Sequence, residues 1–91
     1  MLRSEFGRAT NITTATTTVV KTGPGIFVAV IANAVTTGTI TIYDNTAASG
    51  TKIATIAAGV DPGSAFPYLC QFTNGLTVVT SAADNITVTW G

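Results

Sequence analysis

The chain has 91 residues, of which 46% are hydrophobic and only 9% are charged, and four cations balance four carboxylates. One domain fits this length, and the scattered cations exclude both the basic stripe that binds nucleic acid and the polybasic patch that attracts a membrane. With no His and one Cys, the composition also excludes an internal disulfide, a Cys/His zinc site and a histidine-based catalytic triad. We therefore expect no cofactor, no bound metal and no enzymatic activity.

Residues 1–11 contain half of the basic residues and have no clear hydrophobic period, which predicts an N-terminal arm followed by a domain over 12–91. The start of the chain lacks the apolar core of a signal peptide, so synthesis in the cytoplasm is expected. The arm is the candidate attachment segment, and its distinctive side chains are those of Arg3, Glu5, Phe6 and Arg8.

The first predicted strand covers 12–22, which is rich in β-branched residues, and a Gly-Pro-Gly turn ends it. The next segment, 25–34, is the longest apolar run and is apolar in both phases of a strand. A strand in a two-layer sandwich turns only one face inward, so the other face needs a cover. This pattern predicts a homo-oligomer whose contact includes the second phase, namely Phe27, Ala29 and Ile31.

Alternating apolar and polar residues then predict short strands at 39–43, 51–56, 65–72, 76–80 and 86–90. Pro67 cannot donate to a ladder, so the strand over 65–72 lies at a sheet edge or begins at this residue, and Asn74-Gly75 indicates a hairpin turn. Cys70 shares a phase with aromatic residues, which indicates a buried, inert thiol. The chain is predicted to be all-β, a single-domain sandwich or jelly roll of about seven short antiparallel strands.

Two residue sets leave alternatives open. Asp44 and Asp61 could pair like the carboxylates of a glycosidase, although each lies in a turn-forming sequence and is interpreted as supporting that turn. Tyr43, Tyr68 and Trp90 could form a sugar-stacking platform, but packing in the core or at an interface is the favoured interpretation, because each continues an inward-facing phase.

Three segments together carry a resemblance: the hairpin sequence 39–56, Gly75–Thr80 and Asp84–Trp90. They resemble small Thr/Gly-rich virion proteins of tailed bacteriophages, a group associated with the capsid as head decoration or cement proteins. The resemblance covers 14–91 and has no catalytic motif to transfer.

This resemblance implies a non-enzymatic structural protein made in the host cytoplasm and located on the capsid surface of the virion. Its implied partners are the major capsid protein and further copies of itself. A homotrimer is expected, because a three-fold axis of the shell is a frequent decoration site. The alternative function is a glycan-binding head or fibre module of a phage or cell surface. Neither function calls for nucleic acid or a membrane as a partner.

Overall fold

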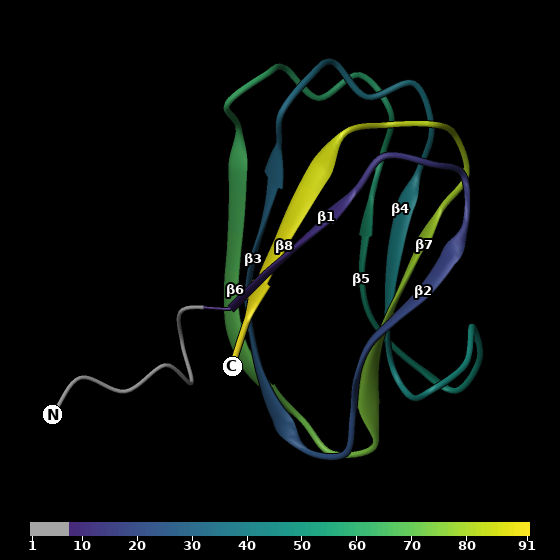
Figure 1. Ribbon diagram of the computed structural model, residues 1–91, viewed down its shortest axis with the longest axis vertical. Helices are drawn as coiled ribbons and strands as arrows, with labels where there is room; N and C mark the ends of the chain where they lie inside the picture. Colours follow the sequence, from purple (N-terminus) through teal and green to yellow (C-terminus); the bar gives the residue numbers. More distant parts are fainter. Residues whose placement is uncertain (1–7) are drawn as a thin grey trace, which may run out of the picture.

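The computed structural model describes residues 8–91, and this part of the chain folds into eight β-strands without a helix (Figure 1). The strands are β1 (Arg8–Ile12), β2 (Thr17–Thr22), β3 (Gly25–Ala32), β4 (Ile40–Asp44), β5 (Thr51–Ile56), β6 (Ala65–Phe72), β7 (Gly75–Thr80) and β8 (Ile86–Trp90).

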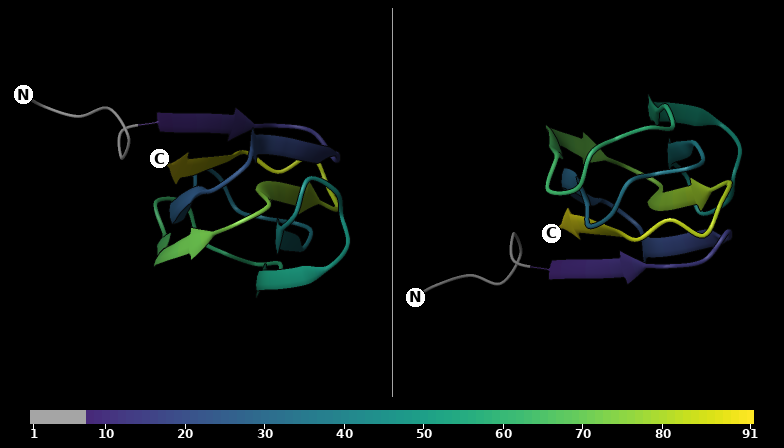
Figure 2. Two further views of the ribbon diagram at one scale, coloured as in Figure 1. Left: turned by 90° about the horizontal axis from the view of Figure 1, so that it is seen from below. Right: turned by 90° about the horizontal axis from the view of Figure 1, so that it is seen from above.

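The strands form two four-stranded sheets, ordered β1-β8-β3-β6 and β2-β7-β4-β5, in which every pairing is antiparallel. Apart from the β4–β5 hairpin, each connection carries the chain from one sheet to the other. This is the strand order of an eight-stranded jelly roll. Viewed along the strands, the two sheets lie as two layers, with β1 and β2 at one end and β6 and β5 at the other (Figure 2). The predicted all-β sandwich is confirmed, with eight strands instead of about seven.

The core lies between the two sheets and follows the alternation of the sequence. Ile40 and Ile42 of β4 and Ile86 and Val88 of β8 are all buried, while the threonines between them face the other way. These four residues belong to one hydrophobic cluster, as their shared phase predicts, and Trp90 packs against its border.

The N-terminal boundary differs from the prediction. Arg8 to Asn11, expected in the arm, belong to β1, which pairs with β8 from Arg8↔Trp90 to Ile12↔Ile86. The predicted strand over 12–22 is in fact two strands in different sheets, joined by a turn at 13–16. Ile12 is the only large apolar residue of β1 and is buried, so local hydrophobicity gives little sign of this strand. The sandwich therefore includes residues from Arg8 onward.

A β-bulge explains why β3 is apolar in both phases. Phe27 pairs with Trp90, but Ala29 already pairs with Thr89, so two steps along β3 match one step along β8. The extra residue exchanges the inward and outward phases. Phe27 therefore points inward before the bulge and is 0% exposed, whereas Val30 points inward after it. The prediction that Phe27 lies at a subunit contact is wrong, because its ring is part of the core.

Candidate functional site

The outer face of the β1-β8-β3-β6 sheet is the candidate functional site. Pairing registers place Ile31 beside Ala65 and Thr87, and Ala29 beside Pro67 and Thr89. Apart from Val28 at the β3 bulge, which has no registered partner, alternation along the four strands gives the outward set: Ala9, Asn11, Ile26, Ala29, Ile31, Ala65, Pro67, Leu69, Gln71, Thr87 and Thr89. None of these outward positions carries a charge. An uncharged, mainly apolar face of this kind is typical of a surface that contacts another protein.

Two of the three predicted contact residues lie on this outer face. Ile31 is half-buried, and Ala29 is 9% exposed. The Thr89 hydroxyl donates to the Ala29 carbonyl oxygen at 3.2 Å. Ile31 is therefore the more accessible of the two.

Leu69 is the most exposed large hydrophobic residue on this face, at 71%. Its φ of 51° lies in the left-handed region, which a leucine rarely adopts. The cause is a second bulge: β6 advances three residues, from Pro67 to Cys70, while β3 advances two. Both Tyr68 and Cys70 pack against the core, and the residue between them is left in solvent. Sequence reasoning missed Leu69, although a large apolar residue in the phase of 65–72 opposite to the aromatic residues was the available signal.

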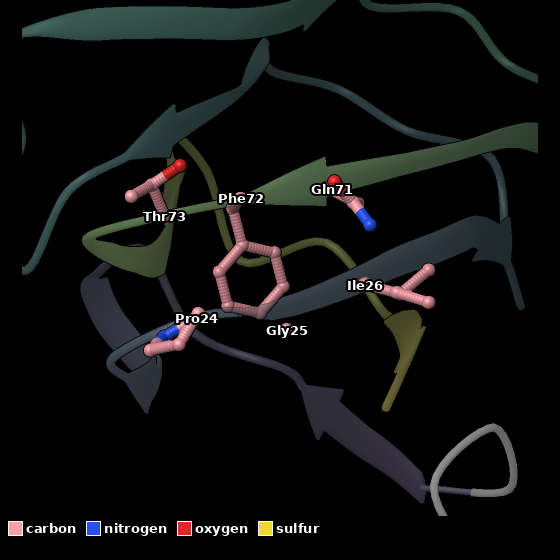
Figure 3. A pocket seen from close by; sticks show the side chains of 6 residues that line it. All are labelled: Pro24, Gly25, Ile26, Gln71, Phe72 and Thr73. Carbon is pink, nitrogen blue, oxygen red and sulfur yellow. The ribbon is translucent and has the colours of Figure 1, made fainter.

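A shallow depression of 330 Å³ adjoins the lower end of this face, where the β2–β3 and β6–β7 turns meet (Figure 3). Gly25 forms part of it, and a Cβ at this position would lie 2.6 Å from the Phe72 ring, so only glycine allows this close approach. Figure 3 shows Phe72 between the turn at Pro24 and the side chain of Ile26. The residues that line the depression are Pro24, Gly25, Ile26, Gln71, Phe72 and Thr73.

The opposite end of the face is polar. The Asn11 amide donates to Asn85 Oδ1 at 2.9 Å, and the Asn33 amide donates to the same oxygen at 3.1 Å and to Thr87 Oγ1 at 2.9 Å. These bonds join β1, β8 and the end of β3 across the sheet. The outer face is therefore hydrogen-bonded at one end and apolar near Leu69 at the other.

The three aromatic residues of the possible sugar platform lie apart. Tyr68 stacks on Phe27 with ring centroids 5.1 Å apart, on the inner side of the sheet. Trp90 Nε1 donates to Thr10 Oγ1 at 3.1 Å, at the border of the core. Tyr43 belongs to β4, in the other sheet. Core packing, the favoured interpretation, describes the first two, and no common platform exists.

Asp84 is a buried carboxylate, 3% exposed, that holds two loops together. It accepts hydrogen bonds from the Thr37 amide at 2.7 Å, the Thr37 hydroxyl at 3.1 Å and the Gly38 amide at 3.1 Å. Burial raises the pKa of this carboxyl, but the three donors outweigh that effect, and the net pKa is below its ordinary value. Asp84 thus ties the β7–β8 loop to the β3–β4 loop.

Asp44 supports the turn that follows β6, not its own. It accepts hydrogen bonds from the amides of Asn74 at 2.8 Å and Thr73 at 3.0 Å, and these bonds lower its pKa. Asp61 is exposed in the β5–β6 loop, at the other end of the eight-residue β6. The two carboxylates are therefore separated by a strand and do not form a pair.

The remaining predicted residues have simpler outcomes. Arg3, Glu5 and Phe6 lie outside the described residues, and the Arg8 guanidinium lies 5.6 Å from the Trp90 ring centroid. Cys70 is half-buried, and burial raises the pKa of its thiol, which agrees with an inert role.

Comparisons of the chain with protein-family models, with curated proteins and with solved structures gave no match. Within residues 8–91, no three Cys, Asp or Glu side chains gather as a metal site would require. This part of the chain also has no helix of the length and hydropathy needed to cross a bilayer.

Proposed function

We propose that this chain is a non-enzymatic structural protein of a phage virion, a decoration or cement module that binds the major capsid protein and self-associates on the shell. The observation that carries the proposal is the uncharged outer face of the β1-β8-β3-β6 sheet. Jelly rolls are recurrent in viral capsid proteins, which agrees with the resemblance drawn from the sequence.

The energetics of this face favour a contact over exposure to solvent. Ile26 and Ile31 are half-buried, and Leu69 is largely exposed. Burying a fully exposed side chain of this size contributes about 1.5–3 kcal/mol, so Leu69 can contribute most of that value and each half-buried isoleucine only part of it. A module that needs neither ligand nor chemistry gains binding energy directly from this burial. Three copies around a local three-fold axis of the shell are the arrangement that the resemblance implies.

A pair of lysine substitutions on opposite faces tests the proposal. Ile31→Lys places a charge on the outer face of the β1-β8-β3-β6 sheet, and Thr55→Lys places the same charge at an exposed position of β5 in the other sheet. Labelled protein is sedimented with undecorated heads assembled from the major capsid protein of the same genome. We expect wild type and Thr55→Lys to sediment with the heads and Ile31→Lys to remain in solution. Equal binding by both variants, or no binding by wild type, would contradict the proposal.

A further inference from the structure

Two features of Leu69 lower the stability of the folded chain, and the fold requires neither of them. Its φ of 51° strains a leucine, and its side chain is 71% exposed to water. A glycine or asparagine adopts the same backbone more easily and exposes less apolar surface. We propose that Leu69 is the anchor of a contact between copies of this chain and that it inserts into the depression beside Ile26 on a second copy. The inference rests on, and deepens, the self-association in the proposed function.

The shape and chemistry of the depression suit this side chain. Its volume is about 330 Å³, and it is open to solvent, so a side chain from a second copy can reach it. Pro24 and Ile26 supply apolar surface above the buried Phe72 ring, and Gln71 and Thr73 supply polar groups. Leu69 and Gln71 are two residues apart on β6, which is roughly 7 Å along a strand. One contact between copies therefore covers both the projecting leucine and the depression.

A second copy supplies both a projecting Leu69 and a depression, and the charge of the face permits this pairing. Because no outward position of this sheet in residues 8–91 is charged, two such faces meet without like-charge repulsion. A strongly charged partner would instead lose the hydration of its charges without gaining an ion pair on this face.

The area of the face indicates how strong the contact is. Four strands about 4.8 Å apart and about six residues long give a face of roughly 400 Å², or roughly 800 Å² for two copies. Stable complexes bury about 1,200–2,000 Å², so this contact is weak in free solution and depends strongly on its anchor. It would become populated where copies are concentrated, as they are on a shell.

Analytical ultracentrifugation of the full chain from micromolar to millimolar concentration tests the inference. Wild type is expected to associate reversibly, and Leu69→Gly to associate at least about tenfold more weakly, because the anchor is gone. The melting temperature of Leu69→Gly should be equal to or above that of wild type, since glycine relieves the strained φ. Val35→Ser removes another exposed hydrophobic side chain, in the β3–β4 loop, and should leave association unchanged.

A complementary variant tests the depression itself. Gln71→Trp fills the depression while leaving Leu69 in place, so it should fail to associate alone. Mixed with Leu69→Gly, which keeps an open depression, it should regain part of the association. The mass reached at saturation by wild type distinguishes two copies from three.

The outcomes separate this inference from the capsid binding in the proposed function. A wild type that stays monomeric to millimolar concentration overturns the contact between copies, while head binding is tested independently by sedimentation. If Leu69→Gly associates as strongly as wild type, only the role of Leu69 is overturned. Failure of the mixed variants to associate excludes the depression as its receptor.

Discussion

Replacing Asp84 with asparagine tests how the loops of the sandwich are held. The carboxylate is buried, and its two oxygens accept three hydrogen bonds, two from Thr37 and one from the Gly38 amide. In Asp84→Asn, one amide oxygen can still face Thr37, but the NH₂ group then faces the Gly38 N–H, donor against donor. The variant keeps the size of the side chain and removes only its charge and one acceptor.

The expected cost follows from the bonds that are lost. Hydrogen bonds to a charged group contribute about 1.5–3 kcal/mol, and an unsatisfied buried amide costs a further 1–3 kcal/mol or so. We therefore expect Asp84→Asn to lower the free energy of unfolding by about 3 kcal/mol, a large part of the 5–15 kcal/mol or so of a typical domain. For a domain of this size, that corresponds to a fall in Tm of roughly 12–24 °C.

Thermal unfolding followed by circular dichroism measures this effect. Asp61→Asn is the matched control, because Asp61 is exposed, and its Tm should stay within a few degrees of wild type. If the Tm of Asp84→Asn equals that of Asp61→Asn, the assigned role of Asp84 is refuted.

The pKa values of Asp84 and Asp44 are lowered in the folded state, so acid favours the unfolded chain. Tm should therefore be constant above about pH 5 and fall as the pH drops below about 4, with a shallower fall in Asp84→Asn. A Tm that does not change with pH would contradict this. Phe27→Ala should lower the free energy of unfolding, measured by chemical denaturation, by about 3–5 kcal/mol, as expected for a core phenylalanine. Substitution of a contact residue would instead mainly change the mass of the oligomer. Deletion of residues 1–12 removes β1 and should lower Tm clearly, because burial of Ile12 alone contributes about 1.5–3 kcal/mol to the free energy of unfolding. An unchanged Tm would show that β1 is dispensable for stability. Gly25→Ala should cost about 1–3 kcal/mol in the same denaturation assay, because its Cβ meets the Phe72 ring, and a neutral result would contradict the close approach.

The sequence predicted the parts of the fold that depend on local periodicity. Ile40 and Ile42 alternate with threonine, as do Ile86 and Val88, and this alternation alone identifies strands with one inward phase. The all-β class and the shared core follow from it. Of the second phase of 25–34, Ala29 and Ile31 lie on the outer face of the sheet, whereas Phe27 lies in the core, and a contact at that face stays a prediction.

The missed features depend on residues far apart in the chain. The bulge that turns Phe27 inward is defined by the pairing of β3 with β8, and no local pattern in 25–34 reveals it. β1 has only one large apolar side chain and is a strand because β8 offers it a partner. Asp84 binds the Thr37 amide across 47 residues of chain, so its structural role could not be deduced from its own turn.

Leucine-methyl NMR tests the central claim, that the outer face of the β1-β8-β3-β6 sheet is the contact surface, most directly. Leu69 is exposed on this face and Leu76 is fully buried in the core, so one labelled sample carries both the probe and its control. On addition of undecorated heads, the Leu69 methyl signals should shift or broaden at lower head concentrations than those of Leu76. If the protein binds the heads while the Leu69 signals stay unchanged, the contact lies elsewhere on the molecule.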